Sequence, residues 1–192
     1  LAVDPTGAAI EKLGNATAHL AGIGAHFIAE KENSDAAIQA NNILTDAHNS
    51  WADFQRQSFN GATDGAPDFT KNMMESYDKW AGETVNAISN EHGKKLLTIG
   101  VQNLRQSLFS SSLKMEAEAG VAFRSNSIDQ STSKYAQMVQ NGSISLEDAR
   151  KNVMTAIANA NFDPVTRLKM GDTAMTTLGN AQLYRSINTN PE

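Results

Sequence analysis

The fold of this chain is decided by a proline-free stretch at residues 92–142, HGKKLLTIGVQNLRQSLFSSSLKMEAEAGVAFRSNSIDQSTSKYAQMVQNG. Apolar residues recur in it at spacings of three, four and seven, which keep one side chain per turn on a single face of an α-helix. At 1.5 Å per residue, one continuous helix over this stretch is about 75 Å long, several times the usual length in a globular domain. We predict a helix-packing or assembly face made of Leu97, Val101, Leu104, Leu108, Met115, Ala119, Ala122 and Phe123.

The apolar face loses its register at two places along this stretch. Between Leu108 and Met115 serines take the place of leucines, and beyond Phe123 the apolar pattern resumes only at Ile128. These interruptions favour a kinked or bundle-packed helix over an uninterrupted supercoil. Serines 110–112 predict a layer of small side chains where another helix comes close.

Turn signals divide the part of the chain before this stretch. Helical apolar spacing over residues 5–59 predicts one long helix or two collinear ones. Asn-Gly, Asp-Gly and a proline within residues 60–67 predict a loop. Asp68 or Thr70 is expected to cap the next helix, which a short turn at residues 90–93 separates from the long one. The two helices joined by that turn should be antiparallel neighbours.

Cap signals also mark the helices after residue 140. Asn141-Gly142 predicts a helix end with a left-handed residue. Ser145, with an aspartate three residues later, predicts the start of a second helix by a capping box. Asp163-Pro164 predicts the start of the last helix, since proline suits the first helical position.

The whole pattern predicts an all-α fold, because no run of alternating β-branched residues is long enough to form a strand. We expect an elongated bundle of about five helices with one very long central helix at about residues 92–141. The expected division is an N-terminal part at residues 1–59 and a bundle at residues 60–192, within one continuous domain. Because the chain starts at Leu1 and not at Met, we expect a piece of a longer polypeptide or a processed one.

Composition limits the classes of function. Hydrophobic residues make up 40% of the chain and aromatic residues only 6%, which predicts a thin core built on alanine and leucine. The net charge of −5 comes without any run of Lys or Arg, so we expect no specific nucleic-acid binding. The chain has no cysteine, which excludes disulfides and thiolate metal sites. No apolar run is long enough to predict a spanning helix.

Small residues at spacings of four, Gly14, Ala18 and Gly22, lie within the amphipathic segment at residues 8–29. Such spacing lets helix backbones approach closely, in membranes especially. Because this segment also carries charged residues and histidines, we predict close packing against a neighbouring helix in water. A transient contact with a host membrane stays open as the alternative.

The ionisable residues predict no catalytic or metal site. His19 and His26 are seven residues apart, too far for one metal ion without a partner helix, and no HExxH pattern occurs. Glu116 and Glu118 point to different faces of a helix, so we interpret them as structural. We therefore expect no metal and no cofactor.

Glu75-Ser76 matches the dipeptide that carries the catalytic acid of lytic transglycosylases. The Gly-Leu-x-Gln stretch that follows this pair in those enzymes is missing. A two-residue match has a high rate of chance occurrence, so we nominate no catalytic residue. Cell-wall hydrolysis by this segment stays as an alternative function.

Three groups of residues, in this order, resemble a helical region of the internal virion proteins, or DNA-ejection proteins, of short-tailed bacteriophages and related prophages. The likeness covers about residues 45–185 and consists of helix-face residues and a capped turn, with no catalytic signature. The residues are FTKNM at 69–73 with YDKWA at 77–81, KKLL at 94–97 with LR at 104–105 and AEAG at 117–120, and ANFDPVTRL at 160–168.

The resemblance implies a protein packaged inside the capsid and expelled with the genome, which then helps to form a conduit across the host envelope. Its implied partners are further copies of itself and other virion proteins. Relatives often carry a lytic transglycosylase domain elsewhere in the chain, but this segment lacks that motif and we expect it not to be an enzyme. A generic helical adaptor or secretion component is the third hypothesis.

Overall fold

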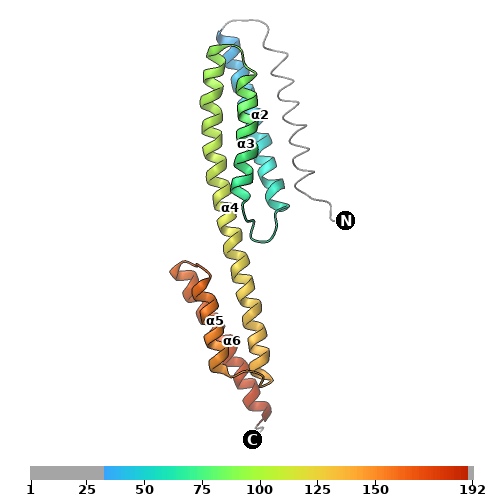
Figure 1. Cartoon of the computed structure of the whole chain (residues 1–192), viewed down its shortest axis with the longest axis vertical. Helices are drawn as coiled ribbons and strands as arrows, with labels where there is room; N and C mark the ends of the chain where they lie inside the picture. The colour runs from blue at the N-terminus through green and yellow to red at the C-terminus, as the bar shows by residue number, and fades with distance from the viewer. Residues whose placement is uncertain (1–32, 190–192) are drawn as a thin grey trace, which may run out of the picture. The chain divides into compact units, whose positions relative to one another are not determined.

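The computed structural model describes residues 33–189, and these residues are helical with no strand. Figure 1 shows the five helices, with α4 as by far the longest at 50 residues. The predicted all-α bundle with one very long central helix is therefore confirmed. The helices are α2 (Asn33–Asn60), α3 (Phe69–Asn86), α4 (Glu91–Gln140), α5 (Leu146–Asn159) and α6 (Pro164–Thr189).

Three of the predicted helix ends are confirmed by their local hydrogen bonds. Gly142 has φ 80°, and the amides that follow α4 donate to the carbonyls of Met138 and Val139, as in a Schellman motif. The Ser145 hydroxyl accepts the Asp148 amide at 3.0 Å at the start of α5. Asp163 accepts two amides of the first turn of α6, whose first residue is a proline.

The chain divides into two compact units between Ala119 and Gly120. Unit 1 comprises the described residues 33–119 and unit 2 comprises residues 120–189. The expected division after residue 59 differs from this one, because α2 packs in the same core as α3 and the first part of α4. The last part of α4 packs with α5 and α6 in unit 2.

Unit 1 is built of three helices that lie side by side (Figure 1). α3 runs antiparallel to α4, as predicted. The Thr70 amide at the start of α3 donates to Glu116, whereas the Tyr77 hydroxyl, further along α3, donates to the carbonyl of Val101, which comes earlier in α4, at 2.7 Å. The core is aromatic at its centre, where the Trp51 ring meets Phe54, Tyr77 and Trp80 edge to face, with centroids 5.1–5.7 Å apart.

α2 runs parallel to α4, and glycines on α4 let it come close. A Cβ placed on Gly93 is 3.3 Å from the carbonyl oxygen of Ala36, and one on Gly100 is only 2.2 Å from a methyl of Leu44. A larger residue at Gly93 would press on the backbone of Ala36, and one at Gly100 would force the Leu44 side chain to move. The two glycines that look like helix-weakening residues in the sequence therefore serve the contact between α2 and α4.

Between Ser112 and Ile128, a range that the structure describes throughout, no residue of α4 is fully buried. Residues 113–119, LKMEAEA, are all strong helix formers, and the ammonium of Lys114 lies 3.9 Å from the carboxylate of Glu118 one turn later. Intrinsic helix propensity therefore supports α4 over residues 113–119, where none of its side chains is fully buried.

Unit 2 has a small core. Nine buried hydrophobic residues form it, and three of them are alanines, which bury little surface. This agrees with the thin core expected from the composition. The nine residues are Ile128, Val139, Ala149, Val153, Ile157, Phe162, Ala174, Leu178 and Ala181.

Predictions made for the first 32 residues, including the small-residue segment at 8–29 and both of its histidines, lie outside the described residues. Among the helices at residues 33–189, none is both long enough and apolar enough to cross a membrane.

Candidate functional site

The eight residues of the predicted assembly face fall into three groups. The leucines and the valine of the first part of α4 are buried in the core of unit 1, and Met115 and Ala119 pack against that core. Ala122 and Phe123 are exposed in unit 2. Up to Ala119 the face thus packs within the chain, so those residues are not open to a second copy. The four buried residues are Leu97, Val101, Leu104 and Leu108.

A buried polar layer replaces the missing leucines of α4. The Gln55 side-chain amide donates to the hydroxyls of Ser112 at 2.7 Å and Ser111 at 2.8 Å, and lies 3.3 Å from the Leu108 carbonyl. Gln55 and Ser112 are both buried. The expected small-side-chain layer is therefore present, and the neighbouring helix is α2. A buried polar layer of this kind makes a shifted register between two helices costly, because the shift leaves polar groups unpaired.

This layer predicts a measurable coupling between α2 and α4. Gln55→Leu is expected to lower the free energy of unfolding by about 1–3 kcal/mol, because the buried Ser112 hydroxyl loses its donor. Gln55→Leu combined with Ser112→Ala should recover part of that loss, since both polar partners are then gone. Urea unfolding of the four proteins of the cycle measures the coupling; additive effects would show that the hydrogen bond contributes nothing specific.

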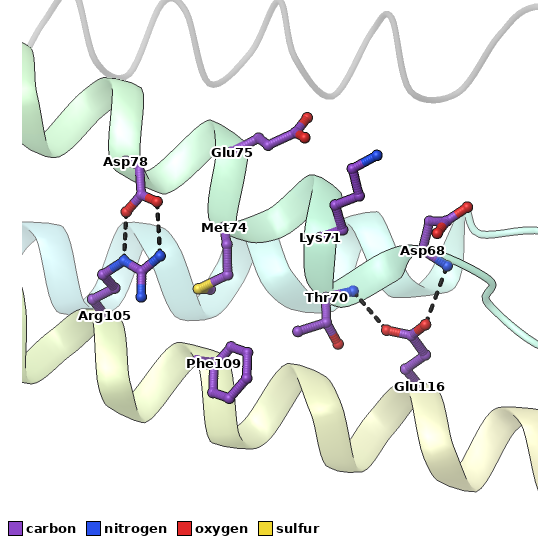
Figure 2. A pocket seen from close by; sticks show the side chains of 9 residues that line it. All are labelled: Asp68, Thr70, Lys71, Met74, Glu75, Asp78, Arg105, Phe109 and Glu116. Atoms are coloured by element: carbon purple, nitrogen blue, oxygen red, sulfur yellow. Dashed lines mark hydrogen bonds and ion pairs between the residues drawn. The ribbon is translucent and has the colours of Figure 1, made fainter.

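An open groove of about 450 Å³ lies between α3 and α4 in unit 1 (Figure 2). Its floor is apolar, with the buried Met74 and the exposed ring of Phe109 facing it. Its rim is charged, and half of the charged groups come from α3. The rim residues are Asp68, Lys71, Glu75, Asp78, Arg105 and Glu116.

One end of the groove is closed by an ion pair. Arg105 donates to both carboxylate oxygens of Asp78, at 2.6 and 2.8 Å. The hydrogen bonds from Arg105 hold the pKa of Asp78 below its ordinary value, and those same bonds raise the pKa of Arg105. Both side chains are about half exposed, so the pair contributes little to stability and acts by aligning the two helices. Behind it, burial raises the pKa of Tyr77.

The other end of the groove holds a helix cap that comes from a different helix. The two carboxylate oxygens of Glu116 accept the amides of Asp68 at 3.1 Å and Thr70 at 2.8 Å, at the start of α3 (Figure 2). The expected cap by the Asp68 or Thr70 side chain is wrong: Asp68 takes the N-cap position in a left-handed conformation, and its side chain makes no cap hydrogen bond. Glu116 satisfies these amides instead and lies where the helix dipole favours a negative charge.

Glu116 is therefore expected to contribute stability that depends on pH. Hydrogen bonding by Thr70, followed by that of the Asp68 amide, holds the pKa of Glu116 below its ordinary value of 4.5. A carboxyl whose pKa is lowered by folding stabilises the protein above its unfolded pKa, and this contribution is lost as the pH falls through the folded value.

Glu116→Ala should accordingly lower the free energy of unfolding by about 1–2 kcal/mol at neutral pH, the usual effect of losing a helix cap. The difference from the parent chain should shrink as the pH falls below about 4.5. Urea unfolding at several pH values measures this, with Glu118→Ala, exposed and two residues away, as the matched control. An equal loss in both variants would contradict the capping role.

Among the residues that the structure describes, no catalytic constellation surrounds Glu75. Its side chain is exposed on the rim of the groove, and the neighbouring Ser76 hydroxyl donates to the Asn72 carbonyl of its own helix. His48 and His92 are exposed. Across residues 33–189, no three His, Asp or Glu side chains are grouped so that they could hold a metal ion.

The surface that sequence reasoning missed lies on α6. Val165, Leu168 and Leu183 are the large apolar residues that recur along this helix, yet all three are exposed. The packed face of α6 is instead a row of mostly small residues spaced by three or four, which lets α5 approach closely. The spacing of these small residues is the sequence feature that could have identified the packed face. The packed face consists of Gly171, Ala174, Leu178 and Ala181.

The opposite side of α6 carries five large exposed hydrophobic side chains. We call them the outer face of α6: Val165, Leu168, Leu183, Tyr184 and Ile187.

No protein-family model matches the chain, and neither does any curated protein or any solved structure. The function of the chain is therefore inferred from the geometry of its own residues. In unit 1 the charged side chains that form hydrogen bonds form them with each other or with backbone amides, as in a scaffold. In unit 2 the conspicuous feature is exposed apolar surface, which suits binding to another protein.

Proposed function

We propose that this chain is a structural and translocation segment of a bacteriophage virion protein, ejected into the host envelope to help form the conduit for DNA delivery. Its place is the capsid interior before infection and the host envelope afterwards. Its partners are further copies of the chain and other ejection proteins. The segment contributes helical scaffold and contact surface, and no chemistry of its own.

The single observation that carries the assembly part of this proposal is the exposed apolar surface of unit 2. Besides the outer face of α6, it includes Phe123 and Met138 on α4 and Met154 on α5. Monomeric soluble proteins rarely expose so many large apolar side chains on so small a unit, and such surface usually marks a binding site.

One further feature agrees with the phage role. The core of unit 2 is small, so its local unfolding should cost little free energy. A chain that passes through a narrow tail needs that property, and the absence of cysteine leaves it free of cross-links.

Assembly is tested by native mass spectrometry and negative-stain microscopy of the purified chain, with and without detergent and lipid vesicles. We expect oligomers whose size grows with protein concentration. In the presence of detergent or lipid vesicles we expect rings or tubes. A strictly monomeric species, indifferent to concentration and to lipid, would contradict the proposal. The phage role is tested by mass spectrometry of purified virions and of host envelope fractions after infection, both of which should contain the chain.

The hydrolase alternative has its own test, a zymogram against purified peptidoglycan. We expect no clearing by the chain. Clearing that disappears in Glu75→Gln but persists in Glu83→Gln, an exposed carboxylate on the same helix, would replace the structural role by an enzymatic one. A pull-down with virion components on one side and host-envelope components on the other separates the proposal from a generic adaptor.

A further inference from the structure

The outer face of α6 is exposed to an extent that a folded monomer does not require. Its five side chains are between 59% and 77% exposed. At about 100° per residue they fall on the half of the helix opposite the packed face, so unit 2 gains nothing from their being apolar. Val165 and Leu168 lie near the start of α6, and the other three residues lie near its end.

The middle of this face is flat. Thr176 and Gly179 lie between the two apolar ends, and a Cβ placed on Gly179 meets no atom within 4 Å. Small side chains at this point let a second helix approach closely, while the apolar groups at both ends remain free to make contact. The arrangement is symmetric about Thr176, which lies eleven residues from both Val165 and Ile187.

We infer that the outer face of α6 binds the same face of a second copy of this chain, with the two helices antiparallel around a two-fold axis near Thr176. In this register Val165 lies opposite Ile187 of the second copy, and Leu168, at the edge of the interface, lies beside Leu183 of the second copy. A two-fold interface needs one patch that is complementary to itself, and the two apolar ends of α6 provide it. The inference rests on the assembly function proposed above and names the surface for it.

The charged residues of this face agree with the same register. Lys169 and Asp172 do not meet their own counterparts, which would repel them. Lys169 lies opposite Leu183 of the second copy, along which its aliphatic stem can pack. Asp172 lies opposite Asn180, whose amide is a donor for a carboxylate.

The area of the face is sufficient for a specific but weak dimer. Five largely exposed side chains of this size offer roughly 500 Å² of apolar surface per copy, and about 1,000 Å² across the interface. That total is at the lower limit for a specific interface, so we expect a dissociation constant in the micromolar range. Such an interface forms at high local concentration and separates on dilution.

The position of the axis is tested by cross-linking, since the chain has no cysteine of its own. Thr176→Cys should give a disulfide-linked dimer in high yield on mild oxidation, because the residue meets its own counterpart at the axis. Thr155→Cys on α5, exposed to solvent like Thr176, is the matched control and should give little. Equal yields from the two variants would overturn the inference.

The antiparallel orientation is tested by mixing two single-cysteine chains. Val165→Cys and Ile187→Cys should form a mixed dimer in preference to either homodimer, since only the mixed pair brings the two thiols together. Predominant homodimers would show a parallel arrangement and overturn the proposed geometry.

The energetic role of the face is tested by sedimentation of Leu183→Glu, with Leu113→Glu, an exposed leucine in unit 1, as the control. Circular dichroism confirms that both variants are folded. Leu183→Glu should raise the dimer dissociation constant about a hundredfold or more, and Leu113→Glu should leave it unchanged. Oligomers that persist in Leu183→Glu would overturn the α6 interface and leave the assembly function standing on another surface.

Two other outcomes would also overturn the inference. A parent chain that is monomeric at all concentrations would remove both the α6 interface and the assembly function. A parent chain that is monomeric in solution, and that loses binding to lipid vesicles in Leu183→Glu, would assign the outer face of α6 to a membrane surface.

Discussion

Trp51→Ala is expected to lower the free energy of unfolding of unit 1 by about 3–5 kcal/mol, the usual cost of removing a large buried aromatic side chain. Trp51 is almost completely buried and meets three aromatic rings of α2 and α3 edge to face. Its loss leaves a cavity that Tyr77 cannot easily fill, because the Tyr77 hydroxyl is bonded to the Val101 carbonyl of α4.

Urea unfolding followed by the fluorescence of Trp80, the remaining tryptophan, measures this effect. Ile38→Ala on the same helix is the control, because Ile38 is exposed and its truncation should change stability by less than about 0.5 kcal/mol. A loss of under 1 kcal/mol in Trp51→Ala, by the same measurement, would show that the aromatic cluster is not the centre of unit 1.

Leu178→Ala is expected to have the second largest effect, a loss of about 2–5 kcal/mol in unit 2. Leu178 is completely buried on α6 and is one of only nine buried hydrophobic residues in that core. A helical unit of this size has a total stability of only about 4–10 kcal/mol, so the substitution should populate its unfolded form.

The two tryptophans allow the two units to be observed separately, since Trp51 and Trp80 both lie in unit 1. In Leu178→Ala the far-ultraviolet circular dichroism should lose helix at low urea, while the fluorescence transition stays in place. Leu168→Ala, an exposed leucine of the same helix, is the control at a concentration where the chain is monomeric. A fluorescence transition that shifts together with the helix signal would show that the chain unfolds as one unit.

Sequence reasoning succeeded where the signal is local. The helix ends at Gly142 and Asp163 follow from φ preferences and from hydrogen bonds that span three residues. The length of α4 follows from a long proline-free stretch with helical apolar spacing. Leu97 and Leu108 were expected to pack against another helix, and both are buried. Such features depend on neighbours within one or two turns, so the linear chain already contains them.

Sequence reasoning failed where the partner is distant in the chain. The cap of α3 comes from Glu116, 46 residues beyond the Thr70 amide that it accepts, and no spacing rule connects the two. The continued spacing at Ala122 and Phe123 suggested one apolar face, but these residues belong to unit 2. The core of unit 2 uses Ile128 and Val139, which lie at a different phase of the helix.

On α6, large apolar residues occur on one side of the helix and mostly small residues on the other. The apolar period of a sequence is determined mainly by its large side chains. Two helices pack closely where side chains are small, here at Gly171 and Ala174 beside Leu178. The sequence by itself determined the all-α class, the long helix and the helix ends, since these follow from backbone preferences of adjacent residues. Only the tertiary structure decided which face of each helix is buried and which is left exposed, because burial depends on what packs against the helix.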